Sequence, residues 1–196
     1  LLASSAASDV YKRQIKIRVI GDYDVDGVMS SYILYRGIRM LGGDVSCRIP
    51  HRVKDGYGIR DYMVDEAADD GVGLIITCDN GIAALGAAKR AKELGIKYIL
   101  TDHHEVPDKD GVESIPVADA VVDPKQKACT YPYNMLCGAG VVYKLMSYIF
   151  EGKNDKSYIS ELLPFAAAAT VCDVVPLADE NRIIAVSYTH LTLPTK

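Results

Sequence analysis

One stretch constrains the fold more than any other, a short β-branched segment that ends in closely spaced aspartates. Residues 17–20 (IRVI) suit a buried strand, and Asp22, Asp24 and Asp26 follow almost at once. Over residues 28–41, apolar or small side chains recur at three- and four-residue steps, which is the period of a helix. A strand, an acidic turn and a helix in this order are typical of α/β folds that bind ligands at the carboxyl edge of their sheet.

The three aspartates allow two interpretations. Like charges crowded on one turn repel each other, and the cost is relieved when they share a cation, which favours a divalent metal site. The alternative is a solvated acidic turn that caps the following helix, since Asp and Gly are common turn residues. The rest of the chain has to decide between them.

The chain beyond this stretch predicts an α/β fold, a mostly parallel Rossmann-like sheet with helices on both faces. Strand-like and helical patterns alternate along it. The expected strands are residues 44–50, 73–78, 96–101 and 119–123, and the expected helices between them are 60–70 and 82–94.

The carboxyl part is predicted to be helical. A turn with two glycines, residues 137–140, opens a helix to about Phe150. A second helix, or a pair of helices, covers residues 158–171 and is expected to break near Pro164, because proline lacks the N–H that a helix interior needs.

Two further strands also end in candidate ligands. Asp79 follows one apolar run, and Asp102, His103 and His104 follow the next. Helix capping explains one strand-end Asp, but not several that converge where such folds bind ligands. Carboxylates with imidazoles suit two Mn²⁺ or Mg²⁺ ions, and the lack of cysteine among the candidates argues against structural zinc. A metal pair is a standard device for phosphoester hydrolysis.

Length and composition set only broad limits. The 196 residues allow one sizeable domain or two small ones, and 49% hydrophobic and 24% charged residues are ordinary for a soluble globular protein. A net charge of −4 neither indicates nor excludes nucleic-acid binding, because bound metal would cancel several acids. No run approaches the roughly 18 apolar residues of a membrane span.

The five cysteines lack the C-x-x-C spacing and are odd in number, which suits a reducing cytoplasm. Cys78 and Cys172 lie beside candidate ligands in apolar runs and are expected to be small core residues.

The two ends differ from the rest in composition and periodicity. Residues 1–14 (LLASSAASDVYKRQ) and 187–196 (SYTHLTLPTK) look like translated sequencing-adapter read-through, so they and His190 are left out of the fold prediction. A genuine disordered tail at each end is the alternative. The predicted domain is residues 15–186.

Four motifs in order resemble the DHH phosphoesterase superfamily, and within it the RecJ branch of single-stranded-DNA-specific exonucleases. They are residues 21–27 (GDYDVDG), 79–81 (DNG), 102–104 (DHH) and 169–176 (ATVCDVVP), the last containing Asp173. Arg52 with residues 55–58, residues 136–140 and residues 180–182 resemble the RecJ branch in particular.

This resemblance implies roles for the candidate ligands. Asp79 would bridge two metal ions, Mn²⁺ or Mg²⁺, with Asp24 on one ion. The other ion would be held by Asp26, His103 and Asp173. Asp22 stands where many relatives have histidine, so it is either a ligand of the first ion or a neighbour of its ligands.

The resemblance also implies a mechanism. Asp102 would orient His103, as bound imidazoles usually require, and His104 would face the substrate phosphate. A hydroxide generated at the metal pair would attack phosphorus in line, so that a 3′-hydroxyl leaves and a 5′-mononucleotide is released. The expected catalytic residues are therefore Asp79, Asp102 and His104.

Most of the candidate substrate-binding residues allow two interpretations. Arg52 is expected to bind phosphate through its guanidinium, or else to pair with a surface acid. Tyr57 is either a packing residue or a base-stacking platform. The N–H groups of Gly138 to Gly140 could hold a phosphate at a helix start, or these glycines could allow a tight helix–helix approach. His51 is expected to be polar surface.

By resemblance, the chain is the catalytic domain of a cytoplasmic 5′→3′ exonuclease on single-stranded DNA in recombination and repair. The resemblance implies a single-strand-binding protein and a helicase as partners, and it implies no association with a membrane. The second substrate-binding domain and OB-fold of such proteins are not in this sequence.

Two alternatives remain. One is a DHH phosphoesterase on small substrates: a pyrophosphatase, an oligoribonuclease or a cyclic-dinucleotide phosphodiesterase. The other is a non-catalytic DHH scaffold, which the intact set of acids and histidines disfavours.

Overall fold

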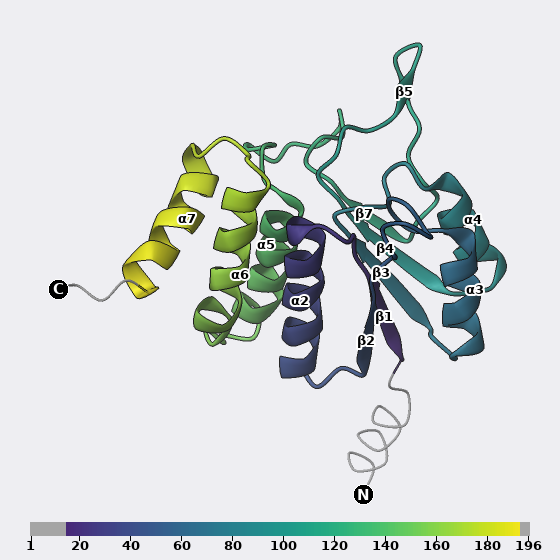
Figure 1. The fold of residues 1–196 in the computed structure, drawn as a ribbon, viewed down its shortest axis with the longest axis horizontal. Coiled ribbons are helices and arrows are strands. Elements are labelled where there is room, and N and C mark those ends of the chain that lie inside the picture. The colour runs from purple at the N-terminus through teal and green to yellow at the C-terminus, as the bar shows by residue number, and fades with distance from the viewer. Residues whose placement is uncertain (1–14, 193–196) are drawn as a thin grey trace, which may run out of the picture.

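The structure, a computed structural model, describes the backbone of residues 15–192 and the side chains of residues 15–187. Its centre is a parallel five-stranded sheet in the order β2-β1-β3-β4-β7 (Figure 1). The strands are β1 (Ile17–Ile20), β2 (Val45–Arg48), β3 (Leu74–Cys78), β4 (Lys97–Thr101) and β7 (Ala120–Val122). The strand order reverses between β1 and β3, and such a reversal opens a crevice at the carboxyl ends of the two strands.

Helices cover both faces of the sheet, so the predicted α/β fold is confirmed (Figure 1). On one side lie α2 (Val25–Met40), α5 (Gly138–Glu151) and α6 (Tyr158–Cys172), with α7 (Asp179–Thr192) packed outside α6. On the other side lie α3 (Asp61–Asp69) and α4 (Leu85–Glu93).

Each face of the sheet has its own core. Successive strand side chains point to opposite faces, so Val19 packs with the α2, α5 and α6 side while Ile20 packs with the α3 and α4 side. Both side chains are 0% exposed. This two-sided burial explains why the strands are short continuous apolar runs rather than alternating ones.

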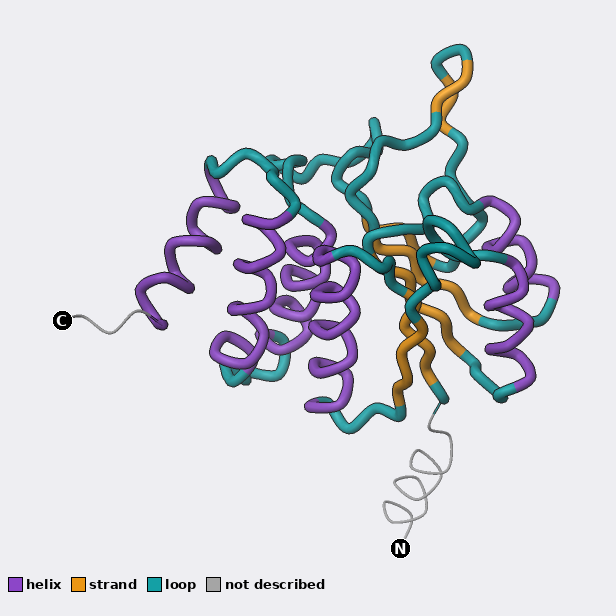
Figure 2. Tube along the Cα trace, in the orientation of Figure 1, coloured by secondary structure: helices purple, strands orange, loops and turns teal. Residues whose placement is uncertain are grey.

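A small antiparallel hairpin, which the pattern did not predict, projects beyond the sheet (Figure 2). Its strands are β5 (Asp108–Lys109) and β6 (Val112–Glu113). Asp110 and Gly111 form the turn with positive φ, and the Gly111 N–H donates to Asp108 Oδ1 over 2.9 Å. An ion pair between Lys127 and Asp108 ties the hairpin back to the loop after β7.

The predicted break near Pro164 is wrong, because α6 is one helix through that residue. Proline removes one backbone hydrogen bond, but tertiary packing supplies most of the stability of such a helix. Leu162, Leu163, Ala166 and Ala167 are all buried around Pro164. Their burial holds both halves of the helix against the same core.

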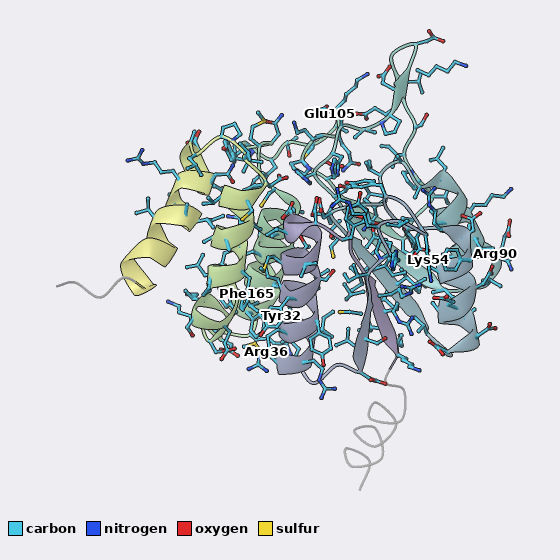
Figure 3. The ribbon with its side chains drawn as sticks, in the orientation of Figure 1. Tyr32, Arg36, Lys54, Arg90, Glu105 and Phe165 are labelled. Atoms are coloured by element: carbon cyan, nitrogen blue, oxygen red, sulfur yellow. The ribbon has the colours of Figure 1, made fainter. Side chains whose placement is uncertain are left out.

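Contacts between α2 and α6 set the position of Asp173, the carboxyl-terminal candidate ligand. The rings of Tyr32 and Phe165 lie 4.2 Å apart, and Arg36 pairs with Glu161 at 3.1 Å (Figure 3). The two helices run in opposite directions, so the end of α6 lies beside the start of α2 (Figure 1). Asp173, the C-cap of α6, is thereby brought to the acidic turn.

The five cysteines are unpaired, and Cys78 is a core residue as predicted. Cys172 is exposed, so its predicted place in the core is wrong. It is the last residue of α6, and Val171 before it is exposed as well.

The predicted flanking segments lie mostly outside the described residues, namely residues 1–14 and 193–196. Helix α7 continues to Thr192 and so passes the expected domain boundary at residue 186, while the side chain of His190 is not described. Among the described helices, none has the length and apolar character to cross a membrane.

Candidate metal centre

The ends of three neighbouring strands bring carboxylates to one edge of the sheet. Asp22 follows β1, Asp79 follows β3 and Asp102 follows β4, and they are exposed by only 0%, 1% and 1%. Asp22 and Asp79 flank the point where the strand order reverses. The site therefore lies where a fold of this class binds its ligands.

The acidic turn after β1 combines both sequence interpretations. Asp24 caps α2, since its Oδ1 accepts the Gly27 N–H over 2.9 Å, and this residue is exposed. Asp22 and Asp26 are buried, so the turn as a whole is not the solvated one that the capping interpretation requires.

The start of α5 is built against Asp26. The Gly138 and Ala139 N–H groups donate to its two carboxylate oxygens over 2.6 and 2.8 Å, and the Gly140 N–H donates to Cys137 Sγ over 3.4 Å. The predicted phosphate-binding role of Gly138 and Gly140 is therefore wrong, because their N–H groups already have buried partners.

The other interpretation, a tight approach, fits Gly138. A Cβ added there would lie 2.8 Å from Asp79 Cβ and 3.0 Å from Asp26 Oδ2. The approach is between a helix start and two acidic turns rather than between two helices.

The candidate ligand atoms form adjoining groups, each with its atoms within 4.8 Å of one another. Asp22, Asp24 and Asp79 make one group, and Asp26, His103 and Asp173 make another. The two meet where His103 Nε2 lies 3.0 Å from Asp79 Oδ1 and 3.5 Å from Asp26 Oδ2. His104 joins Asp79 and His103 in a third group.

The backbone holds Asp79 in an uncommon conformation. Its φ is +57°, a value that costs free energy for a non-glycine residue and persists only when the surroundings enforce it. The Asn80 side chain, 1% exposed, donates to the carbonyls of Ile20 and Cys78 over 3.2 and 2.9 Å. Asn80 thus joins the turn after β3 to β1, a role that its place in the second motif did not reveal.

The electrostatics of the cluster call for a cation. Burial, followed by repulsion from Asp26 and Asp24, raises the pKa of Asp79. Burial is also the main cause that raises the pKa of Asp22 and of Asp173. Within the described residues, Asp22 Oδ2 and Asp79 Oδ2 are buried without a hydrogen-bond partner. A divalent ion shared by these groups would satisfy both oxygens, so the donor set fits Mn²⁺ or Mg²⁺.

Asp102 orients a different histidine from the one expected. Its Oδ1 lies 2.7 Å from the Nδ1 of His104, and its Oδ2 accepts the Ile82 N–H over 2.9 Å. The His103 ring instead faces Asp79, Asp26 and Asp173. The predicted pairing of Asp102 with the His103 ring is therefore wrong, because only the backbone N–H of His103 reaches Asp102.

The hydrogen bond between the side chains of Asp102 and His104 also shifts the pKa of each. Burial alone would raise the pKa of Asp102, but the hydrogen bond from His104 and its positive charge outweigh burial and lower it. The same bond is the main cause that raises the pKa of His104. Asp102 is thus an anion that keeps Nδ1 of His104 protonated.

The loop after β2 places two of the predicted substrate residues, Arg52 and Tyr57, at the rim of the candidate metal centre. The Tyr57 hydroxyl lies 2.8 Å from His104 Nε2, and both line an open cavity of about 360 Å³. The Arg52 guanidinium lies over the Tyr23 ring, 5.5 Å from its centre, and has no ion-pair partner in the described part of the chain. His51 is exposed, and its Nδ1 accepts the Val53 N–H over 3.2 Å.

One further buried acid, to which the sequence pattern assigned no role, lies beside these residues. Asp123 follows β7 beside Asp102 and is 2% exposed, and burial with repulsion from Asp102 raises its pKa to about 6. Its position after an apolar segment was the available signal, the same one that marked the other strand-end aspartates.

Comparison with known proteins identifies relatives of this arrangement. The DHH family, N-terminal domain, matches residues 16–170. The single-stranded-DNA-specific exonuclease RecJ of Bacillus subtilis (strain 168) is 43% identical over 183 residues, which cover 93% of this chain and 22% of that protein.

Two solved structures share the fold. The crystal structure of exonuclease RecJ bound to manganese has a TM-score of 0.79 at 32% identity, covering 94% of this chain and 46% of that one. The crystal structure of RecJ in complex with Mn²⁺ from Thermus thermophilus has a TM-score of 0.74 at 30% identity, covering 96% and 26%. The chain thus spans less than half the length of these relatives.

Proposed function

Because the chain belongs to the DHH family, we propose that it is the catalytic domain of a metal-dependent phosphodiesterase. In this proposal it is a 5′→3′ exonuclease on single-stranded DNA that releases 5′-mononucleotides in DNA recombination and repair. Relatives named as single-stranded-DNA-specific exonucleases support the choice of substrate.

One observation carries the proposal, the two adjoining groups of ligand atoms at the reversal of strand order. Buried carboxylates that raise one another's pKa are costly to a fold that makes no use of them. A non-catalytic scaffold would have no reason to keep them together. The two orphaned oxygens of Asp22 and Asp79 point to the same use, cation binding.

The proposed ligand sets follow the two groups. Asp22, Asp24 and Asp79 would hold one divalent ion, and Asp26, His103 and Asp173 would hold the other, with Asp79 between them. Two such ions, Mn²⁺ or Mg²⁺, supply an activated water and neutralise charge on the phosphoryl oxygens. Relatives with bound Mn²⁺ and Mg²⁺ support the choice of metal.

The remaining residues would position the phosphate. His104, held by Asp102 at Nδ1 and by the Tyr57 hydroxyl at Nε2, lines the cavity beside the ligand groups and would face the bound phosphate. Arg52 at the rim offers a guanidinium fork to the next phosphate. The exposed ring of Tyr57 offers a surface on which a base can stack.

The wider setting belongs to the proposal as well. Five unpaired cysteines agree with a reducing compartment, and we place the protein in the cytoplasm. A single-strand-binding protein and a helicase are the proposed partners.

The test uses two substrates with Mn²⁺ present, because the chain covers only part of its relatives. The first is 5′-labelled single-stranded DNA, and the second is the p-nitrophenyl ester of thymidine 5′-monophosphate, which needs no grip on a long strand. Release of labelled mononucleotide by the parent chain, but not by Asp79→Ala, would support the proposed exonuclease activity.

Other results would redirect or overturn the proposal. Cleavage of the ester, of pyrophosphate or of a short RNA with DNA left intact would indicate a small-substrate phosphoesterase. No cleavage by a chain that calorimetry shows to bind Mn²⁺ would favour a scaffold.

A further inference from the structure

Tyr57 makes contacts that neither packing nor base stacking explains. Its hydroxyl lies 2.8 Å from His104 Nε2 and 3.4 Å from the carbonyl oxygen of Asp79. The tyrosine belongs to the loop between β2 and α3, whereas its two partners follow β4 and β3. One hydroxyl therefore connects a surface loop to two strand ends of the candidate metal centre.

The hydrogen bonds form a continuous chain with consistent donors and acceptors. The Asp102 carboxylate accepts from His104 Nδ1, which leaves Nε2 of His104 facing the Tyr57 hydroxyl. A hydroxyl can donate once and accept twice. Tyr57 can therefore donate to Nε2 of a neutral ring, or accept from a protonated ring while it donates to the Asp79 carbonyl. In both cases the ring of His104 is held at both nitrogens.

The loop itself is anchored on the site. The Gly58 N–H donates to Asp22 Oδ1 over 3.3 Å, directly after Tyr57. The Tyr57 ring meets the rings of Tyr23 and His104 edge to face, with centroids 6.3 and 5.6 Å apart. Because two other rings occupy positions around it, the orientation of the hydroxyl is set by packing as well as by hydrogen bonds.

We propose that Tyr57 is a positioning residue of the reaction, which fixes the His104 ring through its hydroxyl and couples the 51–60 loop to the catalytic centre. This inference rests on the proposed function and deepens it. The contribution of Tyr57 comes from the hydroxyl, which a phenylalanine lacks, whereas base stacking would come from the ring, which a phenylalanine keeps.

The kinetic test compares Tyr57→Phe and Tyr57→Leu with the parent chain on the p-nitrophenyl ester and Mn²⁺. For Tyr57→Phe we expect kcat to fall about 10-fold with KM nearly unchanged, as is common when a group that orients a reactive histidine is removed. Tyr148→Phe is the matched control, because this tyrosine of α5 is 80% exposed and distant from the site. Thermal unfolding of each variant verifies that the fold is kept.

A second readout does not depend on activity. In the metal-free protein, the ¹⁵N resonance of His104 Nε2 should shift in Tyr57→Phe and stay unchanged in Tyr148→Phe. If the parent hydrolyses neither DNA nor the ester, the proposed function fails, and this resonance still decides whether Tyr57 holds the ring. Parent-like kcat and an unshifted resonance in Tyr57→Phe would overturn the inference. A higher KM in Tyr57→Leu alone would then assign base stacking to Tyr57.

Discussion

Asp79 is the residue at which the two ligand groups meet, so its carboxylate has the largest expected effect. Asp79→Asn keeps the shape but replaces two oxygens that share a negative charge with a single neutral carbonyl oxygen. We expect Mn²⁺ affinity and Mn²⁺-dependent ester hydrolysis to fall by more than about 100-fold. The loss of a direct ligand should cost more than the loss of a residue that only hydrogen-bonds to a ligand.

Isothermal titration and the chromogenic assay measure both effects. Asp65→Asn is the control, because that carboxylate pairs with Arg90 on the surface. Parent-like Mn²⁺ affinity in Asp79→Asn would remove this residue from the proposed ligand set.

The raised pKa of Asp79 also predicts how stability depends on pH. Between the ordinary carboxyl pKa near 3.9 and the raised value, the folded chain holds a proton that the unfolded chain has lost. The free energy of unfolding of the metal-free protein should therefore decrease as pH rises from 5 to 7 because of this group.

Urea unfolding in EDTA at several pH values checks this sign. Asp79→Asn should remove up to about 1.4 kcal/mol per pH unit of that decrease. An identical slope in the parent and in Asp79→Asn would show that Asp79 does not carry the proton.

At the level of elements, the start of α5 controls the geometry of the centre. Its N–H groups hold Asp26, and its first glycine lies against Asp79. Gly138→Ala should destabilise the protein by about 1–3 kcal/mol, because the added methyl group has no space beside those turns. It should also weaken Mn²⁺ binding, because the two acidic turns must move apart.

Gly152→Ala is the matched control at the other end of the same helix. A Cβ there would meet its neighbours at 3.5 Å, an ordinary contact, and the φ of −60° suits alanine. Chemical denaturation and calorimetry on both variants separate a local effect at the centre from a general effect of adding a methyl group to α5. Equal stability of the two variants would contradict the predicted steric conflict.

Helix α6 shows how packing at this level overrides a local rule. Pro164 by itself predicts a broken helix, but buried residues before and after it belong to the same core. The unbroken helix carries Asp173 to the start of α2, where it completes a group of candidate ligands with Asp26 and His103. Local propensity could not predict this, because the deciding contacts come from other helices.

At the scale of the whole molecule, metal binding should stabilise the fold. The candidate ligands come from the turn between β1 and α2 and the start of α2, and from the ends of β3, β4 and α6, so the unfolded chain cannot bring them together. At a Mn²⁺ concentration of 100 times Kd, binding to the folded state alone adds about 2.7 kcal/mol. For a chain of this size, we expect Tm to rise by roughly 5–10 °C.

Differential scanning fluorimetry with Mn²⁺, with EDTA and with Ca²⁺ measures this shift. EDTA should reverse it, and Asp79→Asn should lose most of it. A Tm that does not respond to Mn²⁺ would count against a metal centre built from these residues.

The sequence by itself determined the architecture and the chemical nature of the site. Strand and helix periods are local properties, and the carboxyl ends of parallel strands must share an edge, so Asp22, Asp79 and Asp102 could be placed together in advance. The tertiary structure alone decided the partners of each side chain. Asp26 meets Gly138 across 112 positions of the chain, and Asp102 reaches the His104 ring rather than that of His103. A hydrogen bond requires a donor–acceptor distance set to within a few tenths of an ångström and a suitable angle, and the spacing of residues along the chain specifies neither.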